Sequence, residues 1–173
     1  MTAATKPPNN IHHFFRKLGI NRDMKTVIAA CLLLASQTYS VPPVVLAGIY
    51  KVESGQVGQE VGPNKNGSYD LGPMQINTIW LPELAKYWGV SEKAARRYVR
   101  DDACTNFKVA AWILRGHINE TKNLSQAIAH YHSRTYKFGS KYHQRVLLSL
   151  RGKGVLRTAN KPPEGPDASK DKT

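Results

Sequence analysis

The stretch DDACTNFKVAAWILRGHI, residues 101–118, decides the fold class of this chain. Its apolar residues recur at helical spacing and are Ala103, Phe107, Ala110, Ala111, Leu114 and Ile118. This spacing places them on one face of an amphipathic helix. Asp101 and Asp102 are suited to cap that helix and to complement its dipole. The sequence therefore predicts a long helix with one face in a core.

A second helical pattern precedes this stretch. Pro42 and Pro43 can open a helix because its first positions need no amide donor, and Gly55 can close it at the C-cap. Four residues of this segment share one face and are Leu46, Ile49, Tyr50 and Glu53. An acid, Glu53, therefore ends an otherwise apolar stripe. A carboxylate in such a position is either buried with an ionic partner or a functional acid.

The helical pattern breaks down after Gly55. Residues 55–73 hold five glycines and two prolines, which favour loops or a small β-ribbon over a helix. Helices are predicted again after Pro82, after Ser125 as N-cap, and over about residues 140–150. We therefore expect an all-α fold with a minor β element (α+β minor).

Length, composition and charge point to one soluble domain with basic ends. The chain has 173 residues, of which 41% are hydrophobic, and a net charge of +13. A disordered or fibrous chain is thereby disfavoured, and polyanionic partners such as nucleic acid, anionic lipid or bacterial wall are favoured. Seven of the thirteen net charges lie in residues 1–25 and 151–173. These ends lack apolar periodicity, so we interpret them as flexible tails of a domain at 26–150.

The first apolar run, residues 27–35, has two interpretations. It follows a basic residue after Met24, as in a signal peptide, or it forms a buried first helix. The cysteines favour the helix, because Cys31 lies in the run and its removal would leave Cys104 as an odd thiol in an exported protein. If bridged, the two would close a loop of about seventy residues, worth roughly 4 kcal/mol, in an oxidising compartment. Two buried thiols in a cytosolic protein remain the alternative.

Three blocks of sequence carry a family resemblance. They occur in the order VESG at 52–55, YDLGPMQIN at 69–77 and AIAHYHS at 127–133. In order and spacing they resemble the motifs of the soluble lytic transglycosylases, lysozyme-like enzymes that act on bacterial peptidoglycan. The segment DACTN at 102–106 and Cys31 resemble the subgroup that accompanies type IV secretion, conjugation and type IV pilus machines. The resemblance implies a lysozyme-like helical domain over about 26–150, with its β excursion at about 55–78, and a disulfide between Cys31 and Cys104.

The resemblance also implies a catalytic acid, Glu53. It would protonate the glycosidic oxygen between N-acetylmuramic acid and N-acetylglucosamine. It would then act as base while the muramic 6-hydroxyl attacks the anomeric carbon, giving a 1,6-anhydro sugar. Because the substrate supplies the nucleophile, the usual second carboxylate is not required. Glu60 and Asp70 lie in the glycine-rich stretch and remain candidates for one, although Asp70 is more simply a loop-ordering acceptor of backbone amides.

Five further residues match substrate-binding positions of the family, and they are Ser54, Gln75, Tyr131, His132 and Tyr142. Gln75 would hydrogen-bond a sugar or its N-acetyl group, and the hydroxyl of Tyr131 would approach the Glu53 carboxylate. Tyr142 would flank the glycan cleft, although a core position suits it equally well.

Two residues depart from the family pattern. Pro73 stands where Leu or Val is common, and His132 stands where Asn is common. Because His132 adds a titrating group, we predict a sharper loss of activity below about pH 6, which the His132→Asn variant would lack.

Other chemistries find little support in the sequence. The six histidines form no metal-ligand spacing with the cysteines, and neither a phosphate-cradling loop nor a nucleophile elbow is present. We therefore expect no metal and no cofactor. Arg96, Arg97 and Arg100 surround Tyr98 at helical spacing, as in a phosphate-binding face, but a solvated helix face is the simpler interpretation.

Taken together, these patterns predict a monomeric, periplasmic or cell-envelope lytic transglycosylase that opens the wall for a secretion, conjugation or pilus machine. Its expected partners are peptidoglycan glycan strands and components of type IV secretion or pilus assembly, not nucleic acid. An export signal is not evident in residues 1–23. Two alternatives remain, a hydrolytic lysozyme (muramidase) and a basic non-catalytic module that binds glycan or nucleic acid.

Overall fold

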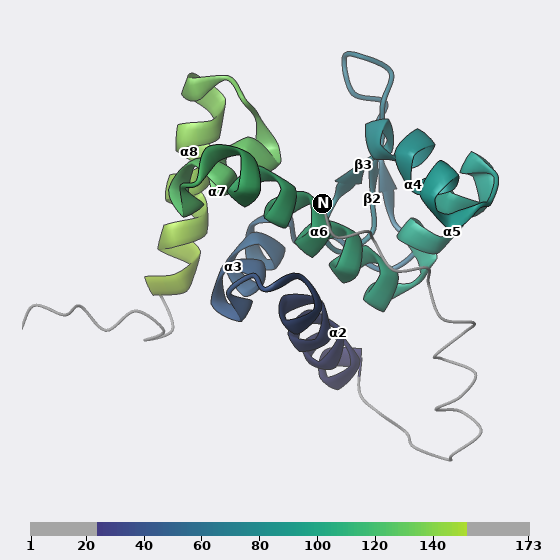
Figure 1. Cartoon of the computed structure of the whole chain (residues 1–173), viewed down its shortest axis with the longest axis horizontal. Helices are drawn as coiled ribbons and strands as arrows, with labels where there is room; N and C mark the ends of the chain where they lie inside the picture. Colours follow the sequence, from purple (N-terminus) through teal and green to yellow (C-terminus); the bar gives the residue numbers. More distant parts are fainter. Residues whose placement is uncertain (1–23, 152–173) are drawn as a thin grey trace, which may run out of the picture.

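The computed structural model describes residues 24–151, which form a mostly helical domain with one small antiparallel sheet (Figure 1). In chain order the elements are α2 (Met24–Tyr39), α3 (Pro43–Glu53), β1 (Glu60–Val61), β2 (Asp70–Leu71), β3 (Ile76–Asn77), the 3-10 helix η1 (Thr78–Trp80), α4 (Leu81–Trp88), α5 (Glu92–Asp101), α6 (Ala103–Thr121), α7 (Leu124–His132) and α8 (Tyr136–Arg151). The all-α class with a minor β element at 55–78 is confirmed. The predicted tails lie outside the described residues, except that α2 includes residues 24 and 25 and α8 includes residue 151.

Helix α6 runs through the middle of the domain. The strands with α4 and α5 lie toward its N-terminal end, and α7 and α8 lie toward its C-terminal end (Figure 1). Phe107, Ala110 and Leu114 of its predicted apolar face are completely buried. Of the two predicted capping acids, Asp102 is the N-cap and accepts a bond from the Thr105 amide (2.7 Å). The other acid, Asp101, ends α5 instead.

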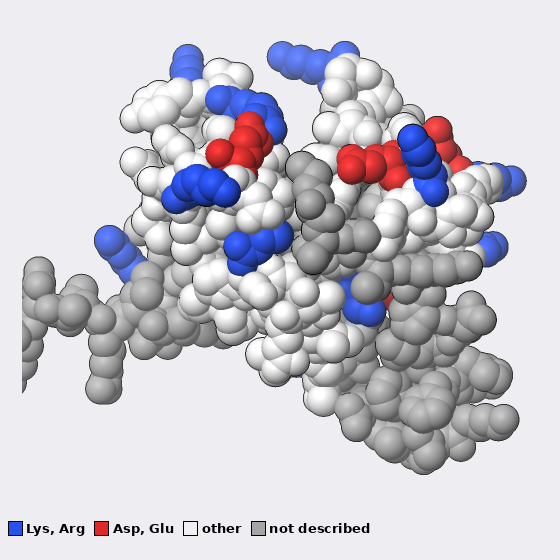
Figure 2. Space-filling view, viewed as in Figure 1, with Lys and Arg blue, Asp and Glu red and all other residues white. Residues whose placement is uncertain are grey.

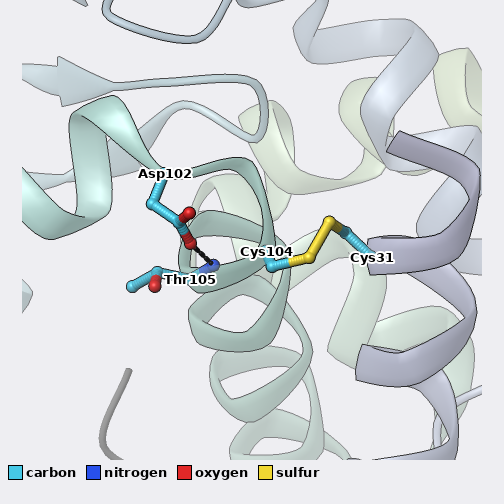
Figure 3. The surroundings of a disulfide bond; sticks show 4 residues. All are labelled: Cys31, Asp102, Cys104 and Thr105. Carbon is cyan, nitrogen blue, oxygen red and sulfur yellow. Dashed lines mark hydrogen bonds between the residues drawn. A yellow bond between two sulfur atoms is a disulfide. The ribbon is translucent and has the colours of Figure 1, made fainter. Parts of the chain in front are cut away.

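The first apolar run forms helix α2, which packs along α6 as the core-helix interpretation predicts. Cys31 of α2 and Cys104 of α6 form the expected disulfide, which links positions 73 residues apart (Figure 3). On the chain-entropy model, closing a loop of that size raises the free energy of unfolding by about 4 kcal/mol. None of the described helices combines the length and the apolar character that crossing a membrane requires.

Two predicted helix ends are wrong by one or two residues. Helix α3 closes at Ser54, which adopts the left-handed conformation (φ 51°), and not at Gly55. Helix α7 begins with Asn123 as N-cap, because its side chain accepts a bond from the Gln126 amide (3.0 Å). Ser125 therefore lies inside the first turn. The last helix also begins about one turn earlier than predicted.

Two of the three arginines in the α5 cluster pair with acids of the protein, and Arg97 lies over the ring of Tyr98. Arg96 donates to Glu60, and Nε of Arg100 lies 2.7 Å from Asp101 Oδ1. On the face shown in Figure 2, basic side chains are spread over the molecule, and the acidic side chains lie beside basic ones. This arrangement agrees with the interpretation of the cluster as a solvated helix face.

Candidate active site

Glu53 is the last residue of α3, and two features hold it there. The helix buries Leu46 and Ile49 completely, which fixes the face from which Glu53 projects. The left-handed turn at Ser54 then ends the helix, since the Ser54 amide donates to the Tyr50 carbonyl at 2.8 Å. The carboxylate consequently lies at the helix end, half-buried at the wall of a cleft.

The surroundings of Glu53 favour its protonated form. Burial raises its pKa from about 4.5 to about 7, and the charge of Asp70 contributes to the rise. A hydrogen bond from the Tyr142 hydroxyl to Oε1 and the charge of Arg145 act in the opposite direction and lower the pKa, but burial dominates. A carboxyl group that holds its proton near neutral pH can serve as a general acid and then as a base.

The turn at residues 72–75 forms one edge of the cleft, and Asn106 of α6 fixes it. Asn106 is completely buried. Its Oδ1 accepts a bond from the Met74 amide (2.7 Å), while its Nδ2 donates to the carbonyls of Leu71 (2.8 Å) and Val99 (2.9 Å). One amide side chain thereby satisfies three buried backbone groups and ties the turn to two helices.

Two glycines allow the end of α3 to approach this turn. A Cβ at Gly55 would lie 2.2 Å from the Gly72 carbonyl oxygen and 2.6 Å from Gln75 Nε2. A Cβ at Gly72, where φ is +67°, would lie 2.6 Å from Asn106 Nδ2. Gln75 Nε2 also donates to the Gly72 carbonyl (2.8 Å). The first two sequence blocks therefore meet in space, and their glycines are required by close packing.

Asp70, on strand β2, also lines the cleft. Its Oδ1 accepts from Asn77 Nδ2 (2.8 Å) and its Oδ2 from Asn64 Nδ2 (3.0 Å). The expected loop-ordering role is present, but the donors are side-chain amides and not backbone amides. Glu60, the other candidate for a second carboxylate, pairs with Arg96 and does not line the cleft.

The cleft has a volume of about 620 Å³ and a mainly polar lining. Four of the predicted site residues contribute to it, and they are Glu53, Gln75, Tyr131 and His132. The sequence reasoning missed seven further polar or aromatic side chains of the lining, and they are Asn64, Lys65, Asn66, Ser68, Asn77, Trp80 and Ser133. Asn64 and Asn66 belong to a polar run within the glycine-rich stretch, and Asn77 ends the second sequence block, but no spacing rule marks such residues as parts of a cleft.

The third sequence block supplies an aromatic layer beside Glu53. The Tyr131 hydroxyl, expected to approach Glu53, donates to the Met74 carbonyl (3.1 Å), whereas Tyr142 donates to the carboxylate. The His132 ring stacks on Tyr142 at 4.8 Å between centroids. Burial raises the pKa of Tyr131 well above its ordinary value, so its hydroxyl remains a donor. Burial likewise lowers the pKa of His132, so the predicted loss of activity is expected at a lower pH.

Ser54 and Tyr142 are not among the residues that line the cleft. Ser54 is exposed, and its Oγ donates to the Lys51 carbonyl at 2.6 Å. Tyr142 is only 2% exposed, and the rings of Tyr131 and His132 stack on it. Its hydroxyl therefore contacts the carboxylate from inside the protein.

Comparison with known proteins agrees with this geometry. A family model for the transglycosylase SLT domain matches residues 30–145, and the chain belongs to that family. The expected lysozyme-like, lytic-transglycosylase relationship is thereby confirmed.

Three curated relatives are similar to this chain over a little less than two thirds of its length. Invasion protein IagB of Salmonella typhimurium is 34% identical over 104 residues, which cover 60% of this chain and 62% of that protein. IagB of Salmonella typhi gives the same values. A peptidoglycan-binding-like protein of Escherichia coli O157:H7 is 27% identical over 115 residues, covering 64% of this chain and 67% of that protein. The chain thus spans about 62% of the length of the IagB proteins.

Proposed function

We propose that this protein is a lytic transglycosylase. It cleaves the β-1,4 bond between N-acetylmuramic acid and N-acetylglucosamine in peptidoglycan and leaves 1,6-anhydro-muramic ends. The observation that carries the proposal is Glu53, a carboxyl group with a pKa of about 7 at the wall of a polar cleft. Membership of the transglycosylase SLT family and the similarity to a peptidoglycan-binding-like protein support it.

The proposed reaction uses Glu53 twice. Its proton passes to the glycosidic oxygen as the bond to the muramic anomeric carbon breaks, which releases the N-acetylglucosamine hydroxyl. The carboxylate then takes the proton of the muramic 6-hydroxyl as that oxygen bonds to the anomeric carbon. The acid is restored, and no water is consumed. The hydrogen bond from Tyr142 keeps the carboxylate in one orientation through both steps.

Asp70 gives electrostatic support in this scheme. The bond-breaking step leaves positive charge on the muramic ring, and a fixed negative charge beside it lowers the barrier. Asn64 and Asn77 hold both oxygens of Asp70 in place, so the carboxylate is preorganised for that task. Its charge also helps to keep Glu53 protonated before the reaction.

Gln75, Tyr131 and His132 hold the glycan. One N–H of Gln75 Nε2 donates to the Gly72 carbonyl, and its Oε1 can accept a bond from a sugar hydroxyl or an N-acetyl amide. Tyr131 and His132 line the cleft beside Glu53 and present aromatic surface to the sugar rings. In this scheme Ser54 and Tyr142 act through Glu53, by ending its helix and by bonding its carboxylate.

The test of this function is loss of turbidity from a suspension of purified peptidoglycan. The wild-type chain is expected to clear the suspension, and the Glu53→Gln variant is expected to lose clearing while it keeps its circular dichroism spectrum and sediments with the wall. Clearing that survives in Glu53→Gln would overturn the assignment. Wall binding without clearing by the wild-type chain would show a non-catalytic glycan-binding module.

We further propose that the protein works in the periplasm or cell envelope, as a monomer, with residues 26–150 as the enzymatic domain between basic tails. The Cys31–Cys104 disulfide supports an oxidising compartment. The resemblance of residues 102–106 and Cys31 to the machine-associated subgroup supports service to a secretion, conjugation or pilus apparatus. Cells that carry Glu53→Gln should then assemble that apparatus poorly, as a deletion of the gene would, and normal assembly would contradict this role.

A further inference from the structure

A group of metal-ligand side chains lies outside the cleft, where α6 and α7 pack together. It consists of His117 and Glu120, one turn apart on α6, and His130 on α7, with ligand atoms within 4.8 Å of one another. His117 Nδ1 lies 3.7 Å from Glu120 Oε2, and the rings of His117 and His130 are 5.9 Å apart between centroids. The sequence does not display this group as a motif, because its members come from two helices.

A second observation indicates that the group lacks a component. His130 Nδ1 is buried and has no hydrogen-bond partner within the described part of the chain. A buried polar atom without a partner is unfavourable, and a histidine nitrogen gains most from a donor or a metal ion. His117 is itself only 6% exposed, so packing holds its imidazole in place, whereas His130 is partly exposed.

The surroundings leave room for an ion and a water ligand. A hollow of about 340 Å³ opens beside the group, and its lining includes Trp112, His117, Asn119 and Glu120. Glu120 lies at its exposed edge, so an ion can enter from solvent.

We propose that His117, Glu120 and His130 bind a transition-metal dication of the Zn²⁺ class. Two imidazoles, one carboxylate and an open position for water form a donor set typical of zinc, whereas magnesium and calcium prefer oxygen ligands. Metal binding at these residues does not require the proposed glycan chemistry.

Arg134 determines how strongly the site binds. It donates to both oxygens of Glu120, with Nη2 at 2.7 Å from Oε2. A carboxylate offers about four lone-pair positions, so two arginine bonds leave others for a metal. The positive charge of Arg134 nevertheless opposes a cation. Removing that charge is therefore expected to strengthen metal binding, although it also breaks an ion pair.

Metal binding at this site would affect the cleft through α7. His130 directly precedes Tyr131 and His132, both of which line the cleft. An ion that joins His130 to α6 would restrict the movement of this segment. The metal would thus hold α7, which carries the glycan-binding aromatic residues, in a fixed position against α6.

The test is Zn²⁺ affinity of the full chain, freed of metal by a chelator and titrated in competition with a chromophoric zinc chelator. Glu120→Gln and His130→Gln each remove one ligand, so each is expected to weaken binding by about tenfold or more. His143→Gln is the matched control, because it removes a histidine of α8 outside this group and should bind like the wild type. Unchanged affinity in Glu120→Gln and His130→Gln would overturn the proposal, as would loss of binding in His143→Gln.

Arg134→Gln supplies a test of opposite sign. It is expected to tighten Zn²⁺ binding by several-fold, because the competing charge is gone while all three ligands remain. The same variant should show a larger rise in melting temperature with Zn²⁺ than the wild type. Weaker binding in Arg134→Gln would exclude Glu120 as the ligand and overturn the site as assigned.

Discussion

Two opposing influences meet at the Glu53 carboxyl group. Burial and Asp70 favour its neutral form, whereas the hydroxyl of Tyr142 and the charge of Arg145 favour its ionised form. The balance leaves its pKa at about 7. A single hydroxyl can therefore move the pH range in which Glu53 is an acid.

The Tyr142→Phe variant tests this balance. Loss of the hydrogen bond removes an influence that lowers the pKa of Glu53, so the alkaline decline of kcat/KM should shift from about pH 7 to higher pH. The measurement is kcat/KM against pH on soluble glycan strands.

Two further variants serve as controls for Tyr142→Phe. Tyr131→Phe should leave the alkaline decline near pH 7, because that hydroxyl bonds the Met74 carbonyl. Asp70→Asn should shift it to lower pH, because a charge that raises the pKa is lost. The same alkaline decline in all three variants would show that Glu53 does not set it.

Glu53 also makes stability depend on pH. Its pKa is higher in the folded protein than in the unfolded chain, so its contribution is fully present below about pH 4.5 and is lost as the pH rises through about 7. We expect the unfolding free energy of the wild type to fall by about 3 kcal/mol relative to Glu53→Gln between these values. Urea unfolding of both proteins at pH 4.5, 6 and 8 measures the difference, and parallel curves would refute the raised pKa.

At the scale of elements, the contact between α6 and the turn at residues 72–75 positions the cleft edge. Asn106 makes three hydrogen bonds to buried backbone groups. The neighbouring Thr105 hydroxyl is buried too, but it has no hydrogen-bond partner in the described residues. These two adjacent polar side chains thus have different energetic roles.

The Asn106→Ala variant is expected to lose about 3 kcal/mol of unfolding free energy or more, since three backbone groups lose their partner. Thr105→Ala, the matched control, should change stability by less than about 1 kcal/mol, because its hydroxyl bonds nothing in the described chain. Urea denaturation measures both values. If the two variants lost the same unfolding free energy, the hydrogen bonds of Asn106 would add nothing to stability beyond its packing.

The sequence predicted elements better than the contacts between them. The periodicity of α6 identified its buried face, because one helix face determines burial locally. The end of α3 was predicted one residue late, since Gly55 serves the close approach to Gly72 and not the cap. The partner of Glu53 could not be predicted from spacing, because Tyr142 lies 89 positions away and a core position suited it equally.

At the scale of the whole molecule, the disulfide joins the first described helix to the central one. It links α2 to the start of α6, next to the N-cap at Asp102 (Figure 3). Asn106 of α6 holds the turn at residues 72–75. Because α6 holds that turn through Asn106, loosening α2 should lower the stability of the whole domain.

Reduction is accordingly expected to lower the unfolding free energy by about 4 kcal/mol. Urea unfolding with and without reductant measures the effect. The double variant Cys31→Ser/Cys104→Ser should match the reduced wild type and should not respond to reductant. A wild-type protein whose stability is unchanged by reductant would contradict a structural role for the bond.

The central claim is that the substrate, and not water, supplies the nucleophile after Glu53 donates its proton. Mass analysis of the muropeptides released from purified peptidoglycan tests it most directly. The account predicts 1,6-anhydro-muramic ends, each lighter by one water than a reducing end, and their absence with Glu53→Gln. Reducing ends alone would contradict it and would identify the protein as a hydrolytic lysozyme.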